Sequence, residues 1–504
     1  MRSQTLKDKA KTGSGSQRYV VTTKKPHEYI GNNRIYGTFP DESNSLKIFF
    51  KGNNNIVHFS GDPQVFHKSK IVFKGDNSIV FLSASEHKYS FVLRLKGDNI
   101  CYFGENLFMN SSDPLKATLA KGQNLFIGKD CLFSLNIRLF AKPGKRRDTK
   151  EPGHIYIGNH VWLAQNTAVT VGSEIGSGAI IGAGTLVDRQ NAEPLGCYAV
   201  RGGVFTRIQD NVMFIGRSIR NIPAASKDIN SIISEKYLRE LLKLTSGDDF
   251  DKFRKVEKAR TPKKRYSRLL RLLGDKNTYK VPKWRADAEV KDLKQRKDED
   301  LPAKENRILG SYDDLGDNKI EFRGQGNTLV FEDGVSLKGS SIIFNGDDSI
   351  VYLCRSNDPY ICRLIMHCDT TLFIGPDAKF DDEGIPSTIS VAECRSVITG
   401  AGCSFGEGSW IRTSDQHPIY DIETRKRINE AKSVILGDNA VVRSGKLILK
   451  GKRLNISEGE RSEAIIKACR KTDKTTDTAA KLAVLEKLSK TLSGQDHSRP
   501  SADK

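Results

Sequence analysis

The chain has 504 residues, more than one domain usually contains, so two or more folded units are expected. Apolar residues make up 37% of it, a globular composition that argues against a disordered chain. The 81 Lys and Arg against 61 Asp and Glu give a net charge of +20, so the location of that charge decides which anionic partners are plausible.

The start of the chain, residues 1–40, is expected to be a basic flexible segment. It has no apolar core of signal-peptide length, and no later run approaches the roughly 18 apolar residues of a membrane-spanning helix. Nine cysteines without a C-x-x-C pair favour buried free thiols in a reducing compartment over disulfides or zinc. We therefore expect a soluble cytoplasmic protein without a bound metal.

Residues 41–223 form a first repeat region, repeat A, which begins with three similar segments. "FKGNNNIVHF", "FKGDNSIVFL" and "LKGDNICYFG" place Gly52, Gly75 and Gly97 at spacings of 23 and 22. Such spacings fit coils of about eighteen residues with a small corner loop, in which Gly-Asp-Asn turns supply positive φ.

The run from 157 to 187, "IGNHVWLAQNTAVTVGSEIGSGAIIGAGTLV", has a strict period of six. Neither a helix nor a two-sided strand has that period, whereas a three-sided parallel β-helix with short strands and tight corners does. The inward-pointing aliphatic residues are predicted to be Ile157, Leu163, Val169, Ile175, Ile181 and Val187.

Residues 224–310 differ in composition and are predicted to form a helical basic linker. The segment from Lys252 to Arg271 carries ten basic residues against one Glu, so it alone supplies +9 of the net charge. We interpret it as a solvated spacer, with contact to an anionic membrane at the inner face or to a partner as the alternative. Basic and aromatic residues are not interleaved here, so nucleic acid is not expected.

The series then recurs as repeat B, residues 311–455. "NGDDSIVYL" (345–353) matches "KGDNSIVFL" (74–82) at an offset of 271, which predicts a tandem duplication. Residues 456–504 are predicted to contain a C-terminal helix and a polar tail. The predicted fold class is all-β dominated: two tandem left-handed parallel β-helices joined by the helical basic linker.

A polar stretch, "RTSDQHPIYD" (412–421), interrupts repeat B. Regular coils offer backbone groups and apolar walls but no proton acceptor. A histidine titrates near neutrality and can take a proton from an attacking hydroxyl group. His417 is therefore the candidate general base.

The coils of repeat A and the loop of repeat B resemble the hexapeptide-repeat acyltransferases, in particular bacterial O-acetyltransferases that act on capsular and lipopolysaccharide sugars. The resemblance implies a homotrimer, acetyl-CoA as co-substrate, a sugar or glycan acceptor, and His417 as catalytic base. The chemistry of the transfer also predicts an oxyanion that is held by backbone N–H groups of the prism edge. Candidate residues for binding the acceptor are Arg412, Ser414, Asp415, Tyr420 and Asp421.

The same resemblance implies a donor groove on repeat A. Its candidate residues are Trp162, Ala164, Gly182, Ala183, Gly184, Gly202 and Arg207. Both repeats depart from the family pattern: repeat A has no histidine in the loop position, and repeat B lacks the last coils and has Val441 in place of the tryptophan. His154 and His160 lie near the loop of repeat A, but neither matches the family's base.

Three interpretations remain open. His417 could work with the donor coils of repeat A in a composite site, within one chain or across a subunit boundary. Both repeats could instead be catalytically decayed, which would leave a scaffold that binds glycan or partner proteins in a polysaccharide-assembly system. A membrane-associated organiser of such a system, held by the basic linker, is the third interpretation.

Overall fold

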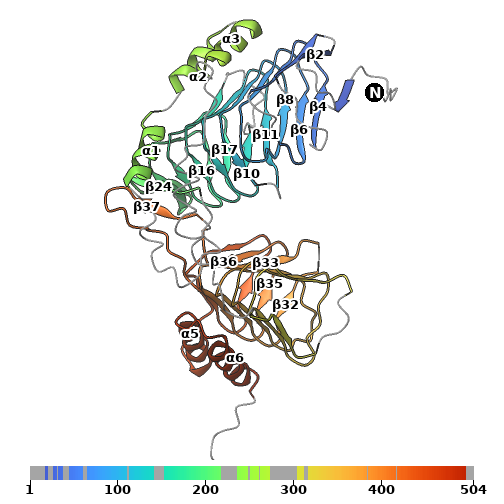
Figure 1. Ribbon diagram of the computed structural model, residues 1–504, viewed down its shortest axis with the longest axis vertical. Coiled ribbons are helices and arrows are strands. Elements are labelled where there is room, and N and C mark those ends of the chain that lie inside the picture. Colours follow the sequence, from blue (N-terminus) through green and yellow to red (C-terminus); the bar gives the residue numbers. More distant parts are fainter. Residues whose placement is uncertain are drawn as a thin grey trace, which may run out of the picture. The chain divides into compact units, whose positions relative to one another are not determined.

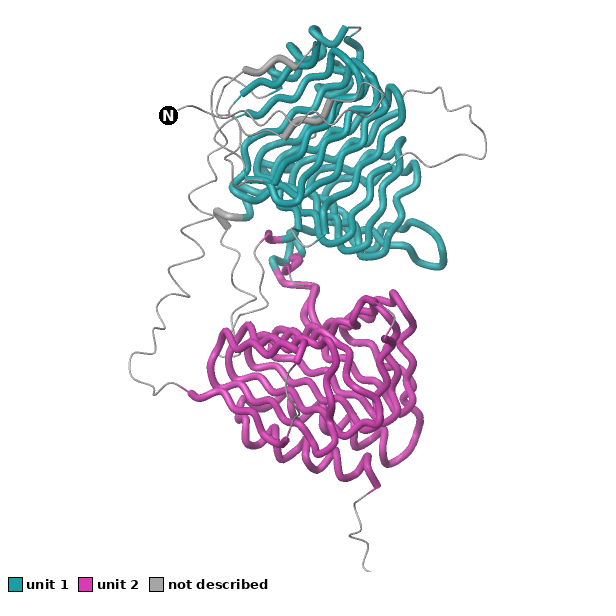
Figure 2. Tube along the Cα trace, turned by 90° about the vertical axis from the view of Figure 1, so that its right-hand side faces the viewer, with its two compact units in different colours: residues 1–214, 233–295, 421–425 teal, residues 215–232, 296–420, 426–504 magenta. Residues whose placement is uncertain are grey.

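A computed structural model describes residues 17–20, 27–30, 32–37, 45–60, 65–110, 113–140, 153–216, 235–247, 250–259, 261–272, 304–311, 316–382, 384–415 and 417–494. Most of the predicted N-terminal segment, the loop of repeat A at 141–152, much of the linker and the tail from 495 lie outside these residues. The chain divides into two compact units (Figure 2). Unit 1 comprises 1–214, 233–295 and 421–425, and unit 2 comprises 215–232, 296–420 and 426–504.

Unit 1 is a parallel β-solenoid whose strands stack into three sheets (Figure 1). The eight-stranded sheet has the order β1 (Gln17–Val20), β4 (Leu46–Phe50), β6 (Ser69–Phe73), β8 (Phe91–Leu95), β11 (Leu115–Leu119), β14 (Arg138–Phe140), β17 (Ala168–Thr170), β20 (Leu186–Val187). The nine-stranded sheet has the order β2 (His27–Ile30), β3 (Asn33–Gly37), β5 (Ile56–Phe59), β7 (Ile79–Leu82), β9 (Ile100–Phe103), β12 (Asn124–Ile127), β15 (His154–Ile157), β18 (Ser173–Ile175), β21 (Asn191–Ala192). The six-stranded sheet has the order β10 (Phe108–Met109), β13 (Leu132–Phe133), β16 (Trp162–Leu163), β19 (Ile180–Ile181), β22 (Cys197–Arg201), β23 (Val204–Gln209). A short strand, β24 (Val212–Phe214), follows.

Unit 2 repeats this architecture with fewer coils. Its seven-stranded sheet has the order β25 (Arg307–Leu309), β27 (Thr328–Phe331), β29 (Ile350–Leu353), β31 (Thr371–Ile374), β34 (Ser396–Thr399), β38 (Val434–Leu436), β41 (Arg453–Leu454). The six-stranded sheet has the order β26 (Lys319–Phe322), β28 (Ser341–Phe344), β30 (Cys362–Met366), β33 (Ser387–Val391), β36 (Trp410–Arg412), β40 (Leu447–Ile448). Three strands, β32 (Lys379–Phe380), β35 (Ser404–Phe405) and β39 (Val441–Val442), form the third sheet, and β37 (Ile419–Asp421) lies in the polar loop. The predicted fold class, two tandem parallel β-helices with helical segments, is confirmed.

The period of six arises from three interior columns, one for each sheet. Ile157 stacks on Ile175, and Val169 stacks on Val187, each pair one coil of eighteen residues apart. These side chains are fully buried in one continuous apolar core. Each sixth residue therefore points inward because each coil turns three corners.

The Gly-Asp-Asn turns differ in one respect from the expectation. In the turn at 74–78 the residue with positive φ is Asn77 (61°), not the glycine, whereas in the turn at 96–99 both Gly97 (118°) and Asp98 (53°) have positive φ. A Cβ added at Gly75 would lie 2.3 Å from the carbonyl oxygen of Lys96 on the next coil. Glycine is needed there because stacked coils approach closely, and asparagine tolerates the left-handed conformation.

The helices are α1 (Glu235–Thr245), α2 (Phe250–Glu257), α3 (Pro262–Leu272), α5 (Glu460–Thr472) and α6 (Thr478–Leu492). The basic helices α2 and α3 are not a free spacer: Phe253, Val256 and Leu269 are buried against the nine-stranded sheet of unit 1. Their apolar stripe, at helical spacing, outweighs the repulsion among their charges. The C-terminal region forms two helices where one was predicted, and both pack on the seven-stranded sheet of unit 2.

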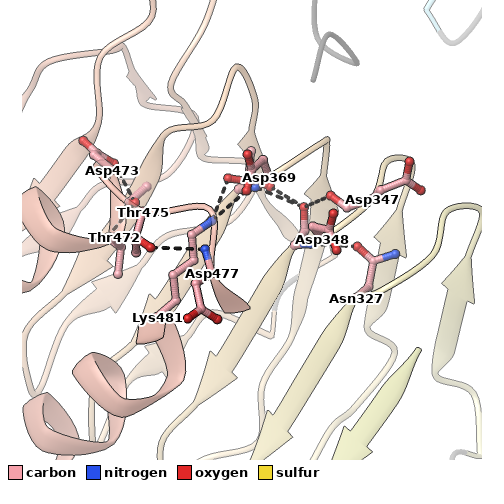
Figure 3. A network of polar contacts seen from close by, with 12 residues as sticks. Asn327, Asp347, Asp348, Asp369, Thr472, Asp473, Thr475, Asp477 and Lys481 are labelled. Carbon is pink, nitrogen blue, oxygen red and sulfur yellow. Dashed lines mark hydrogen bonds and ion pairs between the residues drawn. The ribbon is translucent and has the colours of Figure 1, made fainter. Parts of the chain in front are cut away.

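A buried lysine anchors the C-terminal helices (Figure 3). Lys481 of α6 is 1% exposed, and its Nζ donates to the carbonyl oxygen of Asp369 (3.0 Å) and to its carboxylate (3.1 Å). Asp473 accepts hydrogen bonds from Ser396 and Ser433 of the same unit.

None of the helices in the described ranges is long and apolar enough to cross a membrane.

Candidate active site

The His417 loop replaces a short corner between β36 and β38. The chain leaves the solenoid at Thr413, whose hydroxyl donates to the carbonyl oxygen of Ala392 (3.0 Å) and accepts from the N–H of the same residue (2.9 Å). It returns at Lys432, whose N–H donates to the Thr413 carbonyl oxygen (3.1 Å). These bonds fix the two ends of the loop on unit 2.

Asn429 holds the two arms of this loop together. Its Nδ2 donates to the carbonyl oxygen of His417 (2.9 Å) and to the carboxylate of Asp415 (3.3 Å). Its Oδ1 accepts from the backbone N–H of Ile419 (2.7 Å). One amide thus fixes the backbone on both sides of the histidine. No motif in the sequence points to Asn429, since its role depends on the loop folding back on itself.

Two ion pairs surround the loop. Asp415 pairs with Lys450 at 2.5 Å, and burial lowers the pKa of Lys450 although the Asp415 charge opposes that shift. Arg427 pairs with Glu393 at 2.7 Å, and both side chains are almost completely buried. The hydroxyl of Ser414 donates to Glu393. Lys450 and Glu393 come from neighbouring coils, so only the stacking of the solenoid reveals them.

Arg412 is half-buried, and its Nε lies in the buried part of the side chain. Burial lowers its pKa, while the Asp415 charge acts in the opposite direction. Its Nε has no hydrogen-bond partner among the residues that the structure describes. Of the predicted acceptor residues, Arg412, Ser414 and Asp415 therefore lie in one polar cluster.

The remaining loop residues are less available to a ligand. His417 is 4% exposed and Tyr420 is 1% exposed, and burial raises the pKa of Tyr420 to about 12. Asp421 accepts from the N–H and hydroxyl of Thr424 (both 2.7 Å), and the first of these bonds is the main cause of its lowered pKa. Asp421 thus caps a turn. Segment 421–425 belongs with unit 1, where the Ile422 N–H donates to the Asn211 carbonyl oxygen (2.8 Å).

The predicted donor residues of unit 1 lie on successive coils. Trp162 is buried on β16, and its Nε1 donates to Ser134 Oγ (3.1 Å). The N–H groups of Ala164, Gly182 and Gly184 all donate to carbonyl oxygens of neighbouring coils. These three groups are therefore not free to hold an oxyanion, contrary to the expectation for the prism edge.

The other donor candidates differ in accessibility. A Cβ added at Gly184 or Gly202 would meet nothing within 4 Å, so both corners face open space. Ala183 lies half-buried beside Gly184. Arg207 already pairs with Glu193 (2.6 Å) and with Asp210, so its predicted phosphate contact would compete with two carboxylates.

His160 and His154 occupy structural positions in unit 1. His160 Nδ1 lies 2.7 Å from Asp130 Oδ2, and its Nε2 lies 2.8 Å from the carbonyl oxygen of Phe214. Both ring nitrogens therefore contact groups of unit 1 itself, which fixes the orientation of the ring. His154 stacks on Tyr156 and lies 3.0 Å from Glu174.

All nine cysteines are free thiols. Within the described ranges no group of His, Cys, Asp and Glu has a geometry that could hold a metal ion.

Comparison with known proteins gives one clear sequence relative. The chain is 31% identical over 138 residues to a polysialic acid O-acetyltransferase of Neisseria meningitidis. The match covers 27% of this chain and spans 58% of the length of that relative. No family model matches the chain.

Among solved structures, the chain is similar to the crystal structure of the polySia-specific acetyltransferase NeuO. The identity is 20%, the match covers 42% of this chain and 95% of that one, and the TM-score is 0.33.

Proposed function

We propose that the chain is an acetyl-CoA-dependent O-acetyltransferase that modifies a hydroxyl group of a glycan, with His417 as the general base. The observation that carries the proposal is the conformation of the histidine loop: Asn429 fixes the backbone on both sides of His417 through hydrogen bonds to His417 and Ile419. The sequence relationship with a polysialic acid O-acetyltransferase supports the reaction class.

In this mechanism His417 takes the proton of the acceptor hydroxyl as its oxygen attacks the thioester carbonyl of acetyl-CoA. The tetrahedral intermediate then collapses, the carbon–sulfur bond breaks, and the imidazolium returns the proton to the leaving thiolate. The products are the acetyl ester and CoA thiol. The guanidinium of Arg412, with an Nε that lacks a partner in the described part of the chain, is the proposed donor to the developing oxyanion.

The donor-binding residues belong to the same proposal. The open corners at Gly184 and Gly202 would let the pantetheine arm lie against the backbone, with Trp162 and Ala164 as an apolar wall. Turnover then requires both repeats, since unit 2 supplies the base and unit 1 the donor coils. The phosphate contact by Arg207 requires that it release Glu193 or Asp210.

We also propose a homotrimer, as in the family that the coils resemble. Membrane contact through Lys252–Arg271 would be electrostatic only, because Phe253, Val256 and Leu269 are buried on the solenoid and cannot insert. Sedimentation of the purified chain tests the trimer.

The burial of His417 favours a second candidate function, a catalytically decayed scaffold that binds glycan without transferring acetyl groups. A base that is 4% exposed must gain access to its acceptor before it can act. The scaffold requires no such access.

One assay separates the two functions. CoA release from acetyl-CoA is measured with polysialic acid as acceptor, for the wild type, His417→Asn and the control His87→Asn, which replaces a half-buried histidine of unit 1. The enzyme predicts turnover in the wild type and the control and a loss of about a thousandfold in His417→Asn. Equal rates in all three proteins, or no turnover in any, contradict the assigned base, and glycan binding without turnover supports the scaffold.

A further inference from the structure

The outer face of one sheet of unit 1 carries a regular series of basic side chains. On five consecutive strands of the eight-stranded sheet, β4, β6, β8, β11 and β14, one outward-facing residue is basic. Strands alternate inward and outward side chains, and the burial of β4, β8 and β11 follows that alternation. The residues, hereafter the basic ladder, are Lys47, Lys70, Arg94, Lys116 and Arg138.

Strand pairing fixes the ladder as a line across the sheet. Lys47 lies opposite Lys70 on the neighbouring strand, and Lys116 lies opposite Arg138 on the next strand. Val92 occupies the same row on β8, where Arg94 stands one outward position further along the strand. Because neighbouring strands are about 4.8 Å apart, the five charges span roughly 19 Å.

The ladder is poorly neutralised. None of the eight strands of this sheet contains Asp or Glu. Lys116 pairs with Asp113 (2.9 Å), and Arg138 donates to the amide of Asn136 (3.1 Å). Within the described part of the chain, Lys47 and Arg94 have no ionic partner, and Lys70 contacts only the ring of Phe49.

The duplicated sheet of unit 2 provides an internal reference. Its corresponding row reads Lys319, Ser341, Arg363, Thr388 and Trp410, so two of five positions are basic, against four of five in the matching row of unit 1. Lys319 pairs with Glu321 of its own strand (2.7 Å). The fold therefore does not require the ladder, and like charges on adjacent strands repel one another. Its presence in unit 1 calls for a ligand of opposite charge.

We propose that the basic ladder binds an extended acidic polysaccharide, a polymer of carboxylated sugars, along the line of the five side chains. A narrow series of charges, one on each of five adjacent strands, matches a linear polyanion with one charge per sugar. A membrane surface would instead be matched by a broad basic patch with exposed apolar side chains beside it. The inference rests on the proposed function, because the bound polymer is the acceptor whose hydroxyl groups are acetylated.

The test uses the full chain and end-labelled polysialic acid, without acetyl-CoA. Binding is measured by fluorescence anisotropy at low and moderate ionic strength for the wild type and for Lys47→Gln/Lys70→Gln/Arg94→Gln. The matched control, Lys255→Gln/Lys258→Gln/Lys264→Gln, removes the same charge from exposed positions of α2, of the turn that follows it and of α3. Neutral dextran and phosphatidylcholine–phosphatidylglycerol vesicles serve as alternative ligands.

The wild type is expected to bind polysialic acid, more weakly as salt rises, and not dextran. The ladder variant should lose roughly tenfold in affinity and the control less than about twofold. The ladder variant should be as stable to heat as the wild type or more so, because repulsion is relieved. No binding by the wild type, an equal loss in both variants, or a ladder-dependent binding to vesicles in place of the polymer each overturns the proposal.

Acetyl transfer to a sialic acid dimer separates this inference from the proposed function. The ladder variant should keep the wild-type kcat on the dimer and show a raised KM only on the polymer. If the wild type binds the polymer through the ladder but transfers no acetyl group to either acceptor, the proposed function fails and the binding surface stands. If transfer occurs and the ladder variant has an unchanged KM on the polymer, the binding surface fails alone.

Discussion

The two units cover the same sheet face with a pair of helices, but they anchor those helices with charges of opposite sign. In unit 1, Ile79 and Phe81 of β7 pack beneath α2 and α3. In unit 2, Ile350 and Tyr352 occupy the same positions of β29 beneath α5 and α6. The duplication therefore extends beyond the coils to the helical hairpin that follows each solenoid.

The polar contacts that anchor the helices differ between the two units. In unit 1 the carboxylate of Glu257 on α2 accepts from the hydroxyl of Tyr156 (2.5 Å) and from Asn124 (2.7 Å). In unit 2 the buried ammonium of Lys481 on α6 donates to Asp369 (Figure 3). The apolar contact is retained while the polar anchor is replaced, as expected if burial supplies most of the stability and hydrogen bonds select the orientation.

The largest expected loss of stability comes from removing an aromatic side chain from the apolar contact between the helices and the sheet of unit 1. Phe253→Ala, at a position that is 1% exposed, should destabilise unit 1 by about 4 kcal/mol and release α2 and α3 from the sheet. Hydrogen exchange, read peptide by peptide, should show lost protection in β7, β9 and β12 and none in β29 or β31. Uniform loss over both units would mean that the units are not independent.

Breaking the anchor of unit 2 should cost somewhat less. Lys481→Met keeps the apolar stem but leaves the carboxylate of Asp369 without its buried partner, which should destabilise unit 2 by about 3 kcal/mol. Urea unfolding measures this cost. The matched variant Glu257→Gln in unit 1 should lose only about 1 kcal/mol, because a neutral amide can keep one of the two bonds. A larger loss in Glu257→Gln would reverse the ranking of the two anchors.

Alkaline pH should weaken unit 2 more than unit 1. Burial raises the pKa of the Cys362 and Cys469 thiols to about 12 and that of Cys403 to about 11, and it raises the pKa of Cys354 as well. In unit 1 burial raises the pKa of two thiols, Cys101 and Cys131.

A raised pKa in the folded state means that the stabilisation is complete below the unfolded pKa, near 9, and declines as pH rises above it. Between pH 9 and 10 each deeply buried thiol should cost roughly 1 kcal/mol, so unit 2 should lose about 2 kcal/mol more than unit 1. Pulse alkylation with iodoacetamide, read by peptide mass spectrometry, should label the thiols of unit 2 first. Earlier labelling of Cys101 and Cys131 would contradict this.

The coils were predictable from the sequence because their signal is local. An inward-pointing residue recurs at every sixth position, so the stacking of Val169 on Val187 can be predicted from this segment alone. The packing of α2 and α3 was not predicted from the sequence. Ten basic residues dominate the composition of this segment, and the apolar stripe that packs on the sheet consists only of Phe250, Phe253, Val256 and Leu269. Net charge describes the exposed side of an amphipathic helix and says little about its buried side.

The candidate site was predictable to the extent that it is contiguous in sequence. His417 and Asp415 lie in one quoted stretch, and the structure keeps them in one loop. Lys450 and Glu393 reach that loop from other coils, which sequence spacing cannot indicate. The pairing of Arg207 with Glu193 likewise depends on a hairpin register.

The central claim is that both repeats form the same kind of solenoid but only repeat B supplies the general base. The most direct measurement is the initial rate of acetyl transfer from acetyl-CoA to polysialic acid by His417→Asn and by His154→Asn, which replaces a histidine on strand β15 of repeat A. We expect a loss of about a thousandfold in the first variant and a rate within about threefold of the wild type in the second. A wild-type rate in His417→Asn, or the large loss in His154→Asn, would contradict the claim.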